Sequence, residues 1–92
     1  MQPQPPNDAP EDAYLLALNA LAATLANQRL ADRFLSITGL RAPDLKQRAG
    51  DPHFLADFLR FLEGHEPDLV EIAESISVKP EQIVAARTRL DA

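Results

Sequence analysis

Two histidines, His53 and His65, are the first candidates for acid–base or metal chemistry in this 92-residue chain. His53 and Asp57 are four residues apart, so on a helix they would share one face and could hold a divalent cation between them. Two side chains do not fix a transition metal, which usually takes three or four protein ligands. His65 follows the predicted helix end at Gly64, where a protonated ring would suit the negative end of the helix dipole. We therefore expect surface histidines, with no metal site and no cofactor.

The sequence also contains few residues that could perform nucleophilic catalysis. There is no cysteine, which excludes disulfides, thiolate metal sites and thiol nucleophiles. Ser36, Ser75 and Ser77 have no neighbouring grouping of a histidine with an acid that would complete a catalytic triad. The three glycines are spaced as helix ends and do not form a phosphate-cradling loop. The sequence thus predicts a protein that is not an enzyme, and it shows no site for a small-molecule ligand.

The overall charge disfavours nucleic acid as a partner. The 9 Lys and Arg residues stand against 14 Asp and Glu residues, and the formal net charge is -5. A nucleic-acid protein needs a basic surface that neutralises phosphates. Tryptophan is absent and aromatic residues make up 5% of the chain, too few to form an extended stacking surface for a single strand. This chain could bind DNA only through a local patch of basic residues.

One local pattern nevertheless has the spacing of a DNA-binding helix-turn-helix, and it occupies residues 69–90. Its apolar positions are Ile72, Ala73, Ile76, Val78, Ile83 and Ala86. The second helix of the motif would read the DNA, with Arg87 and Arg89 touching phosphates. Two residues depart from the motif, because Ser77 stands where the turn usually has glycine and Glu81 lies where phosphates or base edges would be. DNA binding is therefore the alternative function.

Proline and glycine divide the chain into helices, since proline suits a first helical turn and glycine suits the residue after a helix. The predicted helices run over about Pro10–Ala26, Gln28–Thr38, Pro43–Gly50, Pro52–Gly64, Glu66–Ser75 and Pro80–Leu90. Asn27 and Asp51 precede two of these helices as capping residues. No segment combines period-two alternation with turn residues, so we expect no strand. The sequence predicts an all-α, compact bundle of five or six short helices.

The first residues differ in composition from the rest of the chain. Four of the eight prolines lie within the first ten residues, so we expect a flexible leader over residues 1–9 and a single helical domain over residues 10–92. Pro3 and Pro6 form a minimal P-x-x-P spacing, which arises easily wherever prolines cluster. No Lys or Arg marks a secretory signal, and the longest apolar stretch, Ala13–Ala26, is too short to span a membrane. We therefore expect a cytoplasmic protein without membrane contact.

Partner binding is indicated by the first predicted helix, which is apolar around most of its circumference. Tyr14, Leu18, Leu21 and Leu25 form one apolar stripe along this helix. Leu16, Ala20 and Ala23 lie away from this stripe, and they would need cover from a second copy or from another protein. Charge is also segregated, because residues 28–48 hold five bases against two acids and residues 51–74 hold seven acids against one base. Both features predict a homo-oligomer or a complex with a protein partner.

Several motifs of the chain resemble a family of short bacterial proteins that is classed as a domain of unknown function. They are Thr38–Gly39–Leu40, Pro43–Asp44–Leu45, Asp51–Pro52, Phe54–Leu55, Phe58–Leu59, Pro80, Ile83, Ala85–Ala86–Arg87 and Leu90. The resemblance runs from about Asp12 to Leu90, and it implies a compact all-helical domain in an alphaproteobacterial cytoplasm. It implies no activity, cofactor or catalytic residue, because the family has none assigned. The resulting hypothesis is a non-enzymatic small helical interaction or accessory module.

Overall fold

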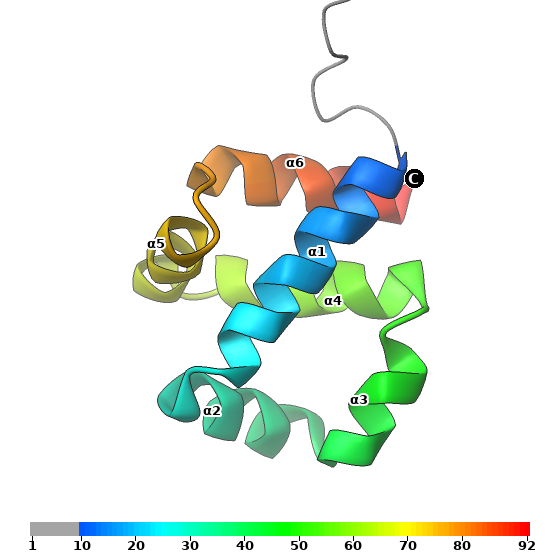
Figure 1. Ribbon diagram of the computed structural model, residues 1–92, viewed down its shortest axis with the longest axis vertical. Helices are drawn as coiled ribbons and strands as arrows, with labels where there is room; N and C mark the ends of the chain where they lie inside the picture. The colour runs from blue at the N-terminus through cyan, green and yellow to red at the C-terminus, as the bar shows by residue number, and fades with distance from the viewer. Residues whose placement is uncertain (1–9) are drawn as a thin grey trace, which may run out of the picture.

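Six helices make up the part of the chain that the computed structural model describes, which is residues 10–92 (Figure 1). They are α1 (Pro10–Leu25), α2 (Gln28–Thr38), α3 (Ala42–Arg48), α4 (Pro52–Glu63), α5 (Glu66–Ser75) and α6 (Pro80–Asp91). This arrangement confirms the predicted all-α fold. The predicted leader, residues 1–9 with its P-x-x-P spacing, lies outside the described residues.

Local chemistry explains where these helices begin and end. The side chain of Asn27 accepts the backbone N–H of Leu30 at 3.2 Å, which caps the start of α2. Asp51 caps α4 in the same way, because its Oδ1 accepts the N–H of His53 at 2.9 Å. Gly39 ends α2 with a φ of 72°, in the left-handed region that side chains with a Cβ disfavour. The predicted roles of these residues as caps are thereby confirmed.

The centre of the core is α4, against which α1, α5 and α6 pack. Figure 1 shows α1 running diagonally across α4, with α6 along the upper edge of the molecule. The apolar face of α4 is fully buried at Leu55, Phe58, Leu59 and Leu62. Phe34 of α2 packs edge-to-face against three phenylalanine rings of α4, and thereby joins α2 to this core.

The core-facing side of α1 differs from the apolar stripe named from the sequence. Its buried residues include Ala13, Ala17, Ala20 and Thr24, each at most 1% exposed. In the stripe named from the sequence, Leu21 is buried, Tyr14 and Leu18 are half-buried and pack against the core, and Leu25 is exposed. The physical reason is the size of the side chains, because small residues let α1 approach the neighbouring backbones closely. The larger Leu15 and Leu25 are exposed on α1, whereas Leu21 is buried.

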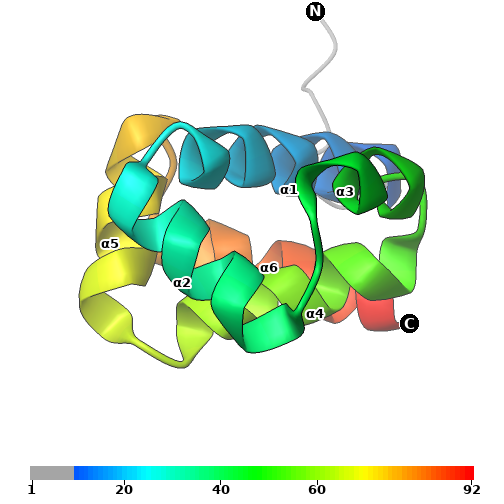
Figure 2. The same cartoon turned by 90° about the horizontal axis from the view of Figure 1, so that it is seen from below.

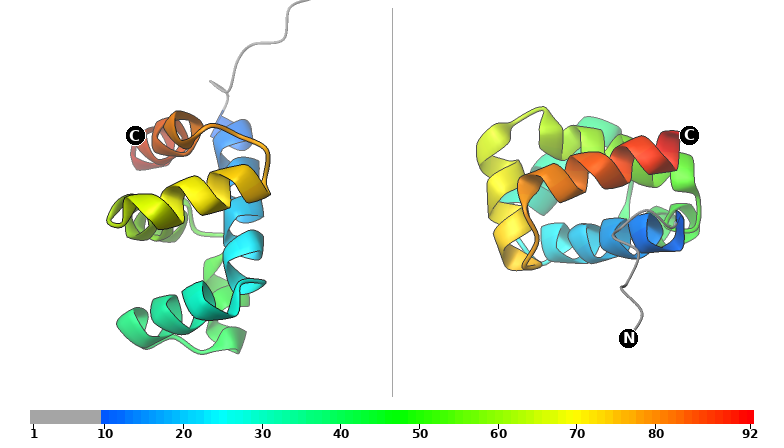
Figure 3. Two further views of the ribbon diagram at one scale, coloured as in Figure 1. Left: turned by 90° about the vertical axis from the view of Figure 1, so that its left-hand side faces the viewer. Right: turned by 90° about the horizontal axis from the view of Figure 1, so that it is seen from above.

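The helices α2 and α3 lie at the end of the molecule away from α6 (Figures 1 and 3). Seen from that end, they stand in front of the remaining helices (Figure 2). Leu45 is the buried residue of α3, and α3 approaches the other helices least closely of the six described. The weakly packed helix α3 lies beside Leu18, Leu21 and Leu25 of α1.

Candidate functional site: an apolar groove beside a basic helix

The pair His53 and Asp57 is exposed on α4 and does not gather further ligands. Asp57 instead forms an ion pair with Arg60, with 2.8 Å between Asp57 Oδ1 and Arg60 Nη1. Among the side chains that the structure describes, residues 12–92, no three from His, Cys, Asp or Glu come together in a way that could hold a metal ion. The carboxylate of this pair therefore has a neighbouring guanidinium as its partner.

His65 belongs to an ion cluster around a buried carboxylate. Its Nδ1 is 3.1 Å from Oδ2 of Asp68, which is 1% exposed and also pairs with Arg33 and, at 3.4 Å, with Arg29. Burial raises the pKa of Asp68, but the hydrogen bond and charge of Arg33, with Arg29 and His65, outweigh it and hold the pKa below its ordinary value. Because both arginines belong to α2, the cluster ties α5 to α2. It also uses two of the five bases found in residues 28–48.

The partner surface predicted on α1 is largely covered by the chain itself. Ala20 is fully buried, so the expectation that a second chain must cover it was wrong. Leu16 and Ala23 are half-buried and pack against the same core. The physical reason is that α2, α4, α5 and α6 all pack against α1. The apolar breadth of α1 thus reflects its central place in the fold.

The two arginines proposed to touch DNA phosphates are engaged within the chain. Arg87 donates two hydrogen bonds to Glu63 of α4, from Nε to Oε2 at 2.8 Å and from Nη2 to Oε1 at 3.1 Å. A third bond runs from Nη1 of Arg87 to Asp91 at 3.3 Å. Arg89 is half-buried and has an interaction of its own. Arg87 therefore fastens α6 to α4, and using it to bind a phosphate would break this link.

The α5–α6 unit has the turn of a helix-turn-helix without the usual charge. Ala73, a small residue of α5, is fully buried. Ser77 has a φ of 61°, the left-handed conformation that glycine usually supplies in such a turn. The exposed residues within α6 are Glu81, Ala85 and Thr88, and none of them is cationic. The spacing noted in the sequence therefore corresponds to two packed helices joined by a tight turn, and no exposed residue within α6 is basic.

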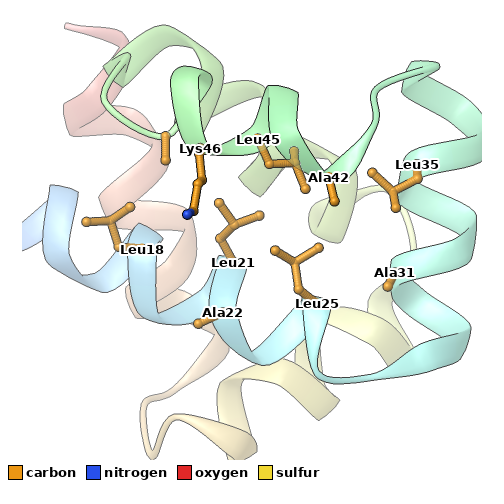
Figure 4. A pocket seen from close by; sticks show the side chains of 10 residues that line it. Leu18, Leu21, Ala22, Leu25, Ala31, Leu35, Ala42, Leu45 and Lys46 are labelled. Atoms are coloured by element: carbon orange, nitrogen blue, oxygen red, sulfur yellow. The ribbon is translucent and has the colours of Figure 1, made fainter.

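The feature that most resembles a binding site is an apolar groove between α1, α2 and α3 (Figure 4). Its volume is about 490 Å³, which falls within the range of ligand pockets. It is lined by Leu18, Leu21, Ala22, Leu25, Ala31, Leu35, Ala42, Leu45, Lys46 and Ala49. Several of these residues are exposed, so the groove is open to solvent. Its chemistry suits apolar groups accompanied by one anion.

The α3 side of the groove contains one cation, and two more lie close to it at the ends of the same helix. Lys46 extends from α3 toward Leu21 of α1 (Figure 4), and Arg41 and Arg48 are exposed at the two ends of α3. Among residues 10–92, none of these three cations forms an ion pair, whereas Arg29, Arg33, Arg60 and Arg87 are all paired with carboxylates. The positive charge that stays available on this part of the surface is therefore concentrated along α3.

Sequence reasoning does not find this groove, although part of its lining is visible in the sequence. Leu18, Leu21 and Leu25 form a regular stripe, but the same stripe is equally compatible with a helix face that meets the core. The other two walls come from helices whose position relative to α1 depends on tertiary packing. The only usable signal is the excess of large apolar residues on α1 beyond what its close contacts can bury.

Comparison with known proteins adds a family to this description and no activity. Residues 10–92 match a protein family described as "Protein of unknown function (DUF3572)". No curated protein and no solved structure matches the chain. Of the helices within residues 10–92, none has the length and hydropathy that crossing a membrane requires.

Proposed function

This chain belongs to DUF3572, a family of unknown function, and from that premise we propose that it is a non-enzymatic interaction module that binds a partner protein in its groove. The observation that carries the proposal is a solvent-open groove of about 490 Å³ with nine apolar residues and one lysine in its lining. Contiguous apolar surface is unfavourable in water, and a recess of this kind with a polar group at its edge is typical of binding sites. The groove thus favours the interaction-module hypothesis.

The side chains of the groove favour binding over catalysis. Lys46 is the one titratable group among the ten lining residues, which include no carboxylate, imidazole or hydroxyl. Acid–base and nucleophilic catalysis need at least two such groups positioned together. His53 and Asp57 belong to α4 and do not line the groove. The groove can therefore hold apolar groups and one anion, but it offers Lys46 no partner for proton transfer.

The size of the groove sets the strength of the proposed complex. Each leucine-sized anchor that becomes buried contributes roughly 1.5–3 kcal/mol, so three anchors contribute about 5–9 kcal/mol. Part of this free energy is offset by the entropy lost on association. A micromolar Kd corresponds to about 8 kcal/mol. We therefore expect a reversible complex with micromolar or weaker affinity.

Site-specific photo-crosslinking in cells of the source organism tests this proposal. A photoreactive amino acid at Ala42, an exposed residue that lines the groove, should give one main adduct with a different protein. The matched control is Ala85, an exposed alanine on α6, which should not give this adduct. Ala22→Trp should fill the groove from an exposed position and suppress the adduct several-fold while the circular dichroism spectrum stays unchanged.

Three results of the crosslinking experiment would contradict the proposal. The first is the same set of adducts from Ala42 and Ala85, which would show contact without a site. The second is an adduct at Ala42 that persists unchanged in the Ala22→Trp variant. The third is an adduct whose crosslinked peptide comes from a second copy of this chain, because the proposal requires another protein.

DNA binding through residues 69–90 is the second candidate function, and one observation favours it. Ser77 adopts the left-handed turn conformation that a helix-turn-helix needs between its helices. Against it stand the absence of a cation among the exposed residues within α6 and the bonds between Arg87 and Glu63. A gel-shift titration at low salt tests it with random-sequence duplex DNA. A shift that Arg89→Ala abolishes would favour DNA binding, and no shift up to about 100 μM protein would eliminate it.

A further inference from the structure

We infer that the partner segment held in the groove is an amphipathic helix that carries acidic residues on the side facing α3. The inference rests on the proposed function and adds the fold and the charge of the occupant. The length of the groove and the unpaired cations of α3 support it. The few large apolar residues that this chain exposes argue against a second copy as the occupant.

The length of the groove matches a short helix. The lining residues of α1 run from Leu18 to Leu25, which is seven steps along the helix or about 10 Å. Apolar anchors at positions i, i+3 or i+4 and i+7 of a bound helix span the same length and point in one direction. An extended segment would turn every second side chain away from the groove. It would also need a sheet edge to pair its backbone groups, and residues 10–92 contain no strand. A helix satisfies its own backbone and needs only the apolar surface that the groove provides.

The cations of α3 set the charge of the occupant. Lys46 lies in the groove wall, and Arg41 and Arg48 lie at the two ends of the same helix. The one acid of α3, Asp44, is half-buried and accepts the backbone N–H of Arg41 at 3.0 Å, so it caps the helix. An uncharged occupant would strip water from Lys46 without giving it a partner, which is unfavourable. Carboxylates beside the apolar anchors would instead form charge-assisted hydrogen bonds with the α3 cations.

The acidic surface on the rest of the molecule would orient an acidic occupant. Residues 51–74 hold seven acids against one base, and the formal net charge of the chain is -5. An acidic helix is therefore repelled by much of the molecule and attracted along α3, with each effect reaching about 8–10 Å at physiological ionic strength. This pattern places the acids of the occupant beside α3 and its apolar anchors between α1 and α2.

A second copy of this chain does not fit the same description. Within residues 10–92, the large apolar residues that are exposed are Leu15, Leu25 and Ile37. Leu25 belongs to the groove itself, and the other two lie on different helices. Outside the groove lining, the described helices therefore present no row of large exposed anchors at i, i+3 or i+4 and i+7. We therefore assign the occupant to a different protein.

Fluorescence anisotropy with designed peptides tests the inference on the full-length protein. The probe is a labelled helical peptide of about four turns with leucines at i, i+4 and i+7 and glutamates beside them. One control peptide replaces every glutamate by lysine, and another keeps the composition but scatters the leucines around the helix. We expect the acidic peptide to bind at least about tenfold more tightly than either control and to weaken as salt is added.

Protein variants then locate the binding. Lys46→Glu should weaken the acidic peptide about tenfold and strengthen the basic one. The matched control is Lys79→Glu, the same change at the exposed lysine that directly precedes α6, and Figure 1 shows α6 and α3 at opposite ends of the molecule. It should change both affinities by less than about twofold, because distant surface charges are screened. Ala22→Trp should abolish binding of the acidic peptide by filling the groove.

The possible failures separate the inference from the proposed function. Equal binding of the acidic and basic peptides, both lost in Ala22→Trp, would overturn the charge of the occupant and leave the proposed function intact. If no peptide binds, the helical occupant is overturned, and the proposed function then depends on the crosslinks at Ala42. Dimerisation that Ala22→Trp abolishes in sedimentation would replace the helix by a second copy. Dodecanoate binding without peptide binding would replace it by a long-chain carboxylate.

Discussion

Replacing Phe34 by alanine should remove a large share of the stability of this protein. Phe34 is 2% exposed, and its ring centroid lies 5.4 Å from that of Phe58, 5.1 Å from Phe61 and 6.3 Å from Phe54. All three contacts are edge-to-face, and all three partners belong to α4. Truncation would therefore open a cavity between α2 and the centre of the fold.

The magnitude follows from the burial of this ring. A buried Phe→Ala substitution costs about 3–5 kcal/mol, and each edge-to-face pair contributes about 0.5–1.5 kcal/mol beyond its burial. A domain the size of residues 10–92 is stable by about 4–12 kcal/mol. Phe34→Ala should thus remove roughly a third or more of the free energy of unfolding. Phe34→Leu keeps most of the volume and loses the ring, so it should cost only about 1–2 kcal/mol.

Urea unfolding followed by far-UV circular dichroism measures these losses. The matched control is Ile37→Ala on the same helix, where the side chain is 66% exposed and the change should stay within about 0.5 kcal/mol. A loss below about 1 kcal/mol for Phe34→Ala, or equal losses for the two variants, would refute the aromatic cluster as the joint between α2 and α4.

The remaining predictions concern the ion cluster and two turns. Asp68→Asn should lower the free energy of unfolding by roughly 1–3 kcal/mol, because Arg33 loses its buried partner. Since the pKa of Asp68 is lowered in the folded state, the stabilisation by its carboxylate is complete above the ordinary carboxyl pKa and is lost as pH falls through the folded-state pKa. In thermal melts at falling pH, the Asp68→Asn variant should therefore lose less stability than the wild type. Parallel curves of melting temperature against pH would contradict this. Gly39→Ala should cost about 1 kcal/mol in urea unfolding because its φ is 72°, whereas Gly50→Ala should be neutral or slightly stabilising, and equal effects would count against the backbone argument. Ser77→Gly should stabilise by about 0.5–1 kcal/mol by relieving a φ of 61°, and a destabilised variant would show that the serine itself fixes the turn.

The helix boundaries could be predicted from the sequence because each depends on a few adjacent residues. Asn27 caps α2 and Asp51 caps α4 through bonds to backbone groups at most three residues away. The predicted bounds differ from the structure by one or two residues, as where α1 ends at Leu25 and α3 begins at Ala42. Such shifts are ordinary at helix ends, where the last turn frays.

The arrangement of the helices could not be predicted, because it depends on contacts between distant residues. Asp68 reaches Arg33 and Arg29 across 35 and 39 positions, and no local pattern links them. The first helix is apolar on two sides, and periodicity alone does not say whether Ala17 or Leu18 meets the core. The structure chooses the smaller side chain because α1 is crowded by four neighbouring helices.

The shortness of α3 bears on which molecules the groove can accept. The helix has seven residues, and Leu45 is the only one of them that is buried. A segment held by so few buried contacts opens at a free energy well below that of global unfolding. The walls formed by α1 and α2 are continuous with the core, whereas α3 has only Leu45 buried against it. If the proposed groove binds a partner, we expect α3 to shift more readily than α1 or α2, so that anchors of different bulk could be admitted.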